Sequence, residues 1–405
     1  MNNYKWQRNN INHNKINNMV LILFEQPSSA TQQQGPIKYD LPDGSIIFNG
    51  DNLDVLKTLP DNSLDSIVTD PPYHLTSINK RFGKENSAPN KFGTDGAFQR
   101  ASKGFLGKHW DGGDIAFRQD VWKECLRVLK PGGHLLAFSH SRTYHNMAVA
   151  IEGSGFEIRD QLMWIYGQGF PKSHNIGNGL GTALKPAHEP IAMARKPLSE
   201  KTVAENVIKW GTGAINIDDC RIDYKNENHR SGGFKNGYKG SIEFAGQINF
   251  SMRSMDAEEI QERCGTGRFP SNLILSDDGN EAWRKFFYCP KASKKDRDSG
   301  LDDRQENKVN DGRIASMDTP FQRGETLRKN THPTVKPTAL MQYLVRLVTP
   351  KNGTCTDVFF GSGSTGKACI REGFKFIGIE KEKEYFDIAV KRCESELNQN
   401  NSMAA

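Results

Sequence analysis

The feature that most limits the fold is a glycine-rich turn near the end of the chain, within residues 354–371. A predicted strand leads into the turn and a predicted helix follows it. Glu380 then ends the next predicted strand, where a carboxylate can accept hydrogen bonds from ribose hydroxyls. Glycines let a ligand approach the backbone closely. The unit therefore predicts the nucleoside-binding half of a doubly wound sheet, and its turn glycines are Gly361, Gly363 and Gly366.

Apolar segments of strand length alternate with segments of helical spacing on both sides of a polar middle region. Phe117–Leu129 and Thr338–Val348 are examples of the helical spacing. Such alternation favours an α/β sheet with helices on both faces. The seven predicted strands are Ser45–Asn49, Ser66–Thr69, His134–Ser139, Phe156–Tyr166, Ile191–Ala194, Thr354–Phe359 and Phe374–Ile379.

Changes in composition predict five regions. Residues 1–36 are rich in Asn and Gln and are expected to be disordered, and residues 399–405 are expected to form a disordered tail. Residues 37–196 and 331–398 carry the alternating pattern and are predicted to form the two halves of one domain. Residues 197–330 are polar, Gly-rich and charged, so they are predicted to be an insertion.

Composition limits the expected cellular location and the expected use of cysteine and metal chemistry. A chain of 405 residues with 36% hydrophobic and 25% charged residues is typical of a globular protein. Its seven cysteines form no C-x-x-C pair and no zinc spacing, which favours free thiols, no metal and a cytoplasmic location. The apolar run Val20–Phe24 is too short to span a membrane.

Asp70-Pro71-Pro72-Tyr73 directly follows the predicted strand Ser66–Thr69. Two prolines stiffen the backbone and remove two N–H donors, so nearby carbonyls are left as acceptors. The Asp70 carboxylate and the Pro71 carbonyl can each accept one N–H bond from a ring amino group. If that amino group belongs to a nucleic-acid base, Tyr73 can stack on the base once the base has left the duplex. These four residues are the predicted catalytic residues.

A basic stretch follows that turn. Residues 76–108 contain seven basic and two acidic residues, interleaved with four phenylalanines. Such a stretch is typical of a solvated loop, but its position just after the Asp-Pro-Pro-Tyr turn favours contact with DNA phosphates. Residues 230–239 are a second, weaker candidate. The predicted DNA-binding residues are Lys80, Arg81, Lys84, Lys91, Arg100, Lys103 and Lys108.

The order of these motifs resembles the permuted, β-type amino-methyltransferases that act on DNA. That family carries Asp-Pro-Pro-Tyr first, then a target-recognition region, then an F-x-G-x-G motif. The resemblance implies a Rossmann-like seven-stranded methyltransferase sheet, a target-recognition role for 197–330, S-adenosylmethionine as cofactor and double-stranded DNA as partner. The segments 185–195 and 286–291 are similar to phage and prophage members.

The resemblance also implies which residues bind the cofactor. Phe359, Gly361 and Gly363 match F-x-G-x-G, and His332 to Pro337 is similar to an H-P-T-x-K-P loop in which Lys336 faces the methionine carboxylate. The family often has Asp-Pro where this chain has Asp357-Val358. The implied cofactor-binding residues are Asp51, His332, Thr334, Lys336, Asp357, Phe359, Gly361, Gly363, Ser364, Thr365 and Glu380.

Several alternatives stay open at this level. Asp at the first position of the catalytic motif favours adenine N6, with cytosine N4 as the alternative, whereas the lack of a Pro-Cys dipeptide argues against attack on cytosine carbon 5. The glycine spacing also matches a dinucleotide fingerprint, so an NAD-dependent oxidoreductase remains a rival. Only 25 residues follow Glu380, too few to complete such a domain. An inert DNA-binding module, a homodimer and a restriction endonuclease partner also stay open.

Overall fold

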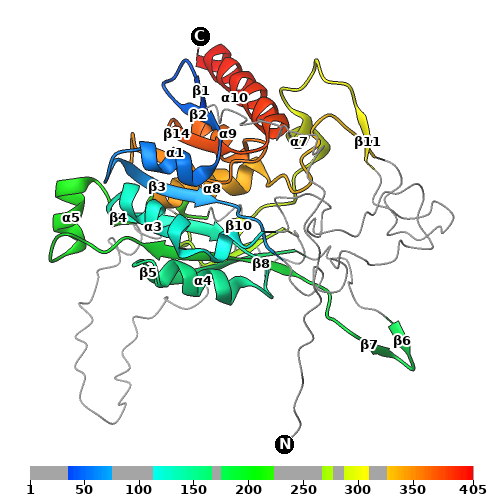
Figure 1. The fold of residues 1–405 in the computed structure, drawn as a ribbon, viewed down its shortest axis with the longest axis horizontal. Coiled ribbons are helices and arrows are strands. Elements are labelled where there is room, and N and C mark those ends of the chain that lie inside the picture. The colour runs from blue at the N-terminus through cyan, green and yellow to red at the C-terminus, as the bar shows by residue number, and fades with distance from the viewer. Residues whose placement is uncertain are drawn as a thin grey trace, which may run out of the picture. The chain divides into compact units, whose positions relative to one another are not determined.

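The computed structural model describes residues 35–74, 113–166, 175–222, 267–276, 287–309 and 326–404. Within the unit formed by residues 36–405, the chain builds one mixed sheet of ten strands (Figure 1). From edge to edge these are β1 (Ile37–Asp40), β2 (Ile46–Asn49), β14 (Lys375–Glu380), β13 (Thr354–Asp357), β3 (Leu64–Thr69), β4 (Leu129–Phe138), β8 (His188–Arg195), β5 (Glu157–Ile165), β9 (Leu273–Leu275) and β10 (Phe287–Tyr288). All seven predicted strands are present, which confirms the predicted sheet.

The centre of the sheet joins the two ends of the chain. Strands β2, β14, β13, β3 and β4 run parallel, whereas β8 is antiparallel to both β4 and β5. Cys355 of β13 lies opposite Ser66 of β3, so the two predicted halves share one set of backbone hydrogen bonds. Every residue of β3 is buried, as expected for a central strand covered on both faces.

Helices cover both faces of the sheet, as predicted. α1, α3 and α4 pack on one face and lie side by side in Figure 1. α8, α9 and α10 pack on the other face. The helices are α1 (Asn52–Thr58), α3 (Gln119–Val128), α4 (Tyr144–Glu152), α5 (Val203–Trp210), α7 (Lys294–Asp298), α8 (Thr338–Val348), α9 (Ser364–Glu372) and α10 (Lys383–Ala404), with short 3-10 turns η3 (Ile115–Phe117) and η4 (Asp218–Cys220).

Local signals explain where some of these helices begin and end. The apolar residues of α3 fall at helical spacing on its buried face: Val121, Trp122, Cys125 and Val128. α9 ends at Gly373, whose φ of +72° is the left-handed stop predicted from the sequence.

The predicted insertion, residues 197–330, needs a correction. Its short apolar run Leu273–Leu275 forms β9, which pairs with β5, and β10 pairs with β9 in turn. Ile274 is fully buried in the core between sheet and helices. Part of the predicted insertion is therefore an edge of the ten-stranded sheet, and only its remaining residues can form a separate recognition region.

The predicted disordered tail, residues 399–405, also needs a correction. α10 continues to Ala404. Asn400 Nδ2 donates a hydrogen bond to the carbonyl of Ile370 at 3.0 Å, which fastens the end of α10 to α9. The segment predicted to be disordered at the other end of the chain, residues 1–36, lies outside the described residues except for its last two.

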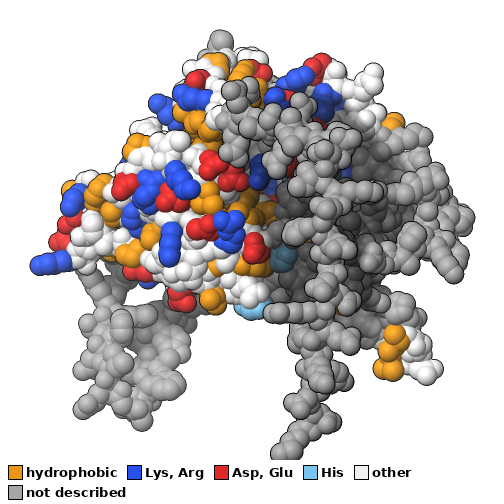
Figure 2. Space-filling model, viewed as in Figure 1, with side chains coloured by type: hydrophobic (Ala, Val, Ile, Leu, Met, Phe, Trp, Pro, Cys, Tyr) orange, Lys and Arg blue, Asp and Glu red, His pale blue; other side chains and the backbone are white. Residues whose placement is uncertain are grey.

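Two small hairpins lie apart from the main sheet: β6 (Asn175–Gly177) with β7 (Leu180–Gly181), and β11 (Asn307–Val309) with β12 (Thr326–Arg328). Basic and acidic side chains are interspersed over the described part of the face in Figure 2. Among the described helices, none combines the length and the apolar character needed to span a membrane.

Candidate active site

Four parallel strands bring polar groups to one end of the sheet, where the carboxyl ends of these strands lie. Asp70 follows β3, Asp357 ends β13, Glu380 ends β14 and Asp51 follows β2. Parallel strands present their carboxyl ends at the same edge, which is where α/β sheets bind ligands. Thr69 hydrogen-bonds Asp357 across 288 positions of sequence. The Asp-Pro-Pro-Tyr turn and the glycine-rich turn therefore lie side by side.

The Asp-Pro-Pro-Tyr turn holds its carboxylate in a buried position. Lys336 Nζ donates to Asp70 Oδ2, whereas the buried Asp70 Oδ1 has no hydrogen-bond partner among the described residues. Burial raises the pKa of Asp70, and the nearby Lys336 ammonium opposes that rise. Thr143 Oγ1 donates to the Tyr73 carbonyl at 3.0 Å and anchors the end of the turn. One carboxylate oxygen is thus held while the other is left to accept a hydrogen bond.

Gly361 and Gly363 serve different purposes in the glycine-rich turn. Gly361 has a φ of +54°, and a Cβ there would meet the His332 imidazole at 2.9 Å. Gly363, at the N-cap of α9, has a φ of +82°, and a Cβ there would meet Ala389 of α10 at 3.1 Å. Gly361 therefore keeps space open beside His332, whereas Gly363 lets two helices pack closely.

Asp357 joins the two turns through hydrogen bonds to both. It accepts from Thr69 Oγ1 at 2.6 Å, Thr365 Oγ1 at 2.5 Å and the Phe359 amide at 3.0 Å. Burial raises its pKa to about 6 despite these donors. The carboxylate thus fixes the end of β3 against the start of α9, and most of its accepting capacity is used within the protein.

Glu380 is buried but keeps accepting capacity. Its Oε2 accepts the Gly361 amide and its Oε1 the Glu382 amide, both at 2.7 Å. Burial raises its pKa to about 8, although both amides lower it. Each carboxylate oxygen has two lone pairs, so each can still accept one further hydrogen bond.

The H-P-T-x-K-P loop is fixed from a neighbouring helix. Arg297, in α7, donates through Nη2 to the carbonyls of His332 at 3.0 Å and Pro333 at 3.3 Å. His332, Thr334 and Lys336 are thereby held toward the strand ends, where all three line a cavity.

Lys336 faces the Asp-Pro-Pro-Tyr turn. Its Nζ bonds Asp70, lies 3.1 Å from Tyr73 Oη and 3.3 Å from Glu189 Oε2. Burial alone would lower the pKa of Lys336, but the Asp70 and Glu189 carboxylates outweigh it and raise that pKa. Lys336 is therefore an ammonium whose protons are shared among protein acceptors. Its predicted contact with a cofactor carboxylate stays a prediction.

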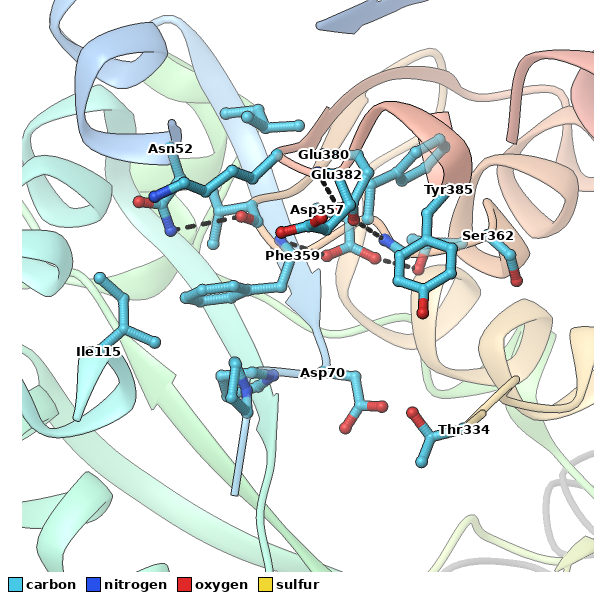
Figure 3. Close-up of a pocket in the computed structure, with 18 of the residues that line it drawn as sticks. Asn52, Asp70, Ile115, Thr334, Asp357, Phe359, Ser362, Glu380, Glu382 and Tyr385 are labelled. Carbon is cyan, nitrogen blue, oxygen red and sulfur yellow. Dashed lines mark hydrogen bonds between the residues drawn. The ribbon is translucent and has the colours of Figure 1, made fainter. Parts of the chain in front are cut away.

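These groups surround one cavity of about 380 Å³. In Figure 3 the Asp70 carboxylate lies beside Thr334, while Asn52, Glu380 and Glu382 lie at the other end. All four predicted catalytic residues line it, and so do all predicted cofactor residues except Gly363. The predicted residues in the wall are Asp51, Asp70, Pro71, Pro72, Tyr73, His332, Thr334, Lys336, Asp357, Phe359, Gly361, Ser364, Thr365 and Glu380.

A family model described as DNA methylase matches residues 64–391. The chain belongs to this family of DNA methylases. The methylase is similar to Type II methyltransferase M.HindIII of Haemophilus influenzae (strain Rd), with 27% identity over 385 residues, 87% of this chain and 96% of the relative. M.HinfI of Haemophilus influenzae, also a Type II methyltransferase, is 22% identical over 353 residues, 86% of this chain and 68% of the relative.

Among solved structures, the chain is similar to TTHA0409, a putative DNA modification methylase from Thermus thermophilus solved with S-adenosyl-L-methionine. The two share 18% identity, the match covers 86% of this chain and 94% of that chain, and the TM-score is 0.38.

Membership of the methylase family decides against the oxidoreductase alternative that the glycine spacing left open. The third glycine of the spacing, Gly366, has a packing role here. A Cβ on Gly366 would meet the rings of Phe360 at 2.6 Å and Phe376 at 2.9 Å. It permits α9 to lie close to β14, as the third glycine of such turns commonly does.

Sequence reasoning missed several residues of the methylase cavity. Asn52, Arg118 and Tyr385 line it, and Tyr385 packs edge-on against His332 with ring centroids 4.6 Å apart. Glu189 contacts the Asp-Pro-Pro-Tyr turn from β8, although in the sequence it was only part of a segment that resembles family members. The sequence signal that could have identified Glu189 was its position just before the predicted strand Ile191–Ala194. The predicted DNA-binding residues, from Lys80 to Lys108, lie outside the described residues.

Proposed function

We propose that this DNA methylase transfers a methyl group from S-adenosylmethionine to the N6 amino group of an adenine in duplex DNA, after the base is extruded. The observation that carries the proposal is Asp70. It lies in the cavity wall with Oδ2 bound by Lys336 and with a buried Oδ1 that no described residue bonds. An acceptor left open beside a nucleoside-sized cavity suits an incoming amino group.

The cavity fits S-adenosylmethionine as the methyl donor. Glu380 retains acceptor sites for ribose hydroxyls, and Ser364 Oγ is buried without a hydrogen-bond partner among the described residues, so it can donate to the methionine carboxylate. Asn52 lies at the Glu380 end of the cavity, and Asp51, which also lines it, pairs with Lys381 at 3.1 Å. The donor supplies a sulfonium methyl group, whose C–S bond breaks with its electrons passing to sulfur as the amine lone pair forms the N–C bond.

The catalytic turn makes the amino group reactive by accepting its protons. The amine lone pair is delocalised into the base ring, which makes the nitrogen a poor nucleophile. Asp70 Oδ1 accepts one N–H and the Pro71 carbonyl accepts the other, which favours a tetrahedral nitrogen. Tyr73 stacks on the extruded base, a contact worth about 1–3 kcal/mol. The methylated nitrogen then loses one proton, and Asp70 Oδ1 is placed to accept it.

Adenine is proposed over cytosine because Asp stands first in Asp-Pro-Pro-Tyr, which resembles the adenine-specific pattern. Cytosine N4 remains the alternative, since the family includes both reactions. Long-read sequencing of DNA from a host that expresses the methylase reports both the modified base and its context. We expect N6-methyladenine within one short recurring sequence. N4-methylcytosine at such a site would replace adenine in the proposal, and unmodified DNA would count against both.

Cofactor affinity should depend on pH through Glu380. Its pKa of about 8 leaves the carboxyl largely protonated at lower pH, when it offers fewer acceptor sites to ribose. Adenosine, which has no group that titrates near pH 8, should therefore bind more tightly as the pH rises through about 8. Isothermal titration on either side of that pH measures the change. Glu380→Gln should bind weakly with no such dependence, and a pH-independent wild type would contradict the role of Glu380.

Duplex binding should weaken steeply with salt, because the basic stretch 76–108 is proposed to hold DNA phosphates. Lys80→Gln with Arg81→Gln should lower the slope of log affinity against log salt by about 2, one per phosphate contact. The matched control is Lys351→Gln with Lys375→Gln, which lie near the amino ends of β13 and β14, away from the cavity. Equal slopes in the two double variants would remove the stretch from the DNA interface.

The remaining parts of the proposal concern recognition and context. The residues of 197–330 outside β9, β10 and α7 are proposed to read the target sequence. Both relatives are named Type II methyltransferases, which supports site-specific modification of DNA. We further propose that the methylase acts in the cytoplasm, with a second copy of itself and a restriction endonuclease as candidate partners.

A further inference from the structure

Four side chains form one buried polar cluster: Asp70, Tyr73 and Lys336, which line the cavity, and Glu189, which does not. Tyr73 Oη donates to Glu189 Oε2 at 2.8 Å. Lys336 Nζ bonds Asp70 Oδ2 and lies within 3.3 Å of both Tyr73 Oη and Glu189 Oε2. The side chains of Lys336, Asp70 and Glu189 are only 9%, 17% and 18% exposed. Interactions among their charges are therefore little screened by solvent.

Glu189 reaches this cluster from a separate strand. It lies near the start of β8, and it is not among the residues that line the cavity. It contacts two side chains, Tyr73 and Lys336, and its charge also helps to raise the pKa of Asp70. The first of these carries the ring proposed to stack on the base, and the second holds the carboxylate proposed to accept the amine proton.

The charges of the cluster do not cancel. Two carboxylates share one ammonium, so the cluster carries a net charge of −1. The three protons of Lys336 are matched by three acceptors, on Asp70, Glu189 and Tyr73. If Glu189 were neutral, Lys336 would pair with Asp70 alone and the net charge would fall to zero.

We infer that Glu189 is a positioning residue for methyl transfer, which shares Lys336 with Asp70 and orients the Tyr73 ring. This inference rests on the proposed function. During transfer, positive charge moves from sulfur to the amine nitrogen beside Asp70. A preorganised site with net negative charge stabilises that shift. Glu189 keeps the site negative by drawing part of the Lys336 charge away from Asp70.

The first test is Glu189→Gln, which retains an acceptor for Tyr73 Oη and removes the charge. The single-turnover rate of methyl transfer to DNA should fall about 10- to 100-fold, the range that the loss of an outer hydrogen-bond partner produces in metal sites. Affinity for S-adenosylmethionine should stay within about twofold, because Glu189 does not line the cavity. Glu157→Gln is the matched control: it removes the carboxylate that pairs with Arg195, a residue of the same strand as Glu189, at 2.7 Å, and should leave the rate unchanged.

A double variant separates shared charge from mere packing. Lys336→Met leaves two carboxylates without a cation, so it should lower both Tm and rate. Adding Glu189→Gln to Lys336→Met restores the net charge of −1. The double variant should therefore melt at a higher temperature and react faster than Lys336→Met alone, although Glu189→Gln slows the wild type.

The outcomes are distinguishable. Losses that simply add in the double variant, in Tm and in rate, would overturn the shared-charge inference. Wild-type rate in Glu189→Gln would also overturn it. A wild type that transfers no methyl group to DNA would defeat the proposed function and the role of Glu189 in it, while the Tm comparison would still report whether Lys336 is shared.

Discussion

Replacing Asp70 by alanine should slow methyl transfer by about 10²–10³-fold, the usual cost of removing one preorganised polar contact at a reaction centre. The carboxylate oxygen proposed to face the amino group would be lost, and Lys336 would keep Glu189 and Tyr73 as polar partners. Affinity for S-adenosylmethionine should change little, because Glu380 and the glycine-rich turn remain. Single-turnover rates and isothermal titration measure the two quantities separately.

The matched control for Asp70→Ala is Asp61→Ala. Asp61 precedes β3 and Asp70 follows it, so the control removes a carboxylate near the opposite end of the same strand. Asp61→Ala should react at the wild-type rate. Wild-type turnover in Asp70→Ala would refute the catalytic assignment. Loss of cofactor binding together with the rate would place Asp70 in the cofactor subsite instead.

Replacing Gly361 by alanine should weaken binding of S-adenosylmethionine by about 10- to 200-fold, the effect of one misplaced methyl-sized group in a fitted pocket. The new Cβ would lie 2.9 Å from the His332 imidazole and would intrude on the cavity that Gly361 lines. The left-handed backbone adds a destabilisation of about 1–2 kcal/mol. Isothermal titration and thermal melting report the two effects.

Gly373→Ala distinguishes blockage of the cavity from backbone strain. Gly373 has a similar left-handed φ of +72°, but a Cβ there has no atom within 4 Å, and the residue is not part of the cavity wall. Gly373→Ala should lower Tm as Gly361→Ala does and yet bind S-adenosylmethionine normally. If the two variants lost affinity equally, strain would explain the loss and Gly361 would have no direct part in the cofactor site.

The elements that carry their own local signals were predictable from the sequence. The predicted helix Thr338–Val348 has those bounds in the structure, and α9 stops at Gly373 as predicted. Strand ends were equally informative, because Asp70 and Glu380 follow clear apolar runs. Parallel pairing then brings such ends together without any further information.

The features that sequence reasoning missed depend on contacts between distant segments. β9 is three residues long and becomes recognisable as a strand only beside β5. Glu189 gains its meaning from Lys336 and Tyr73, which reach it from two other parts of the chain. Lys336 lines the cavity, and its Nζ also contacts two carboxylates of the protein, a pairing that its motif alone does not show.

The most direct test of the account uses purified methylase, labelled S-adenosylmethionine and unmethylated duplex DNA, followed by digestion of the DNA to nucleosides. Label should appear on the exocyclic nitrogen of adenine with the wild type, and should fall to near background with Asp70→Ala. Label on a ring carbon, or DNA that stays unlabelled while the folded protein binds both cofactor and duplex, would contradict it.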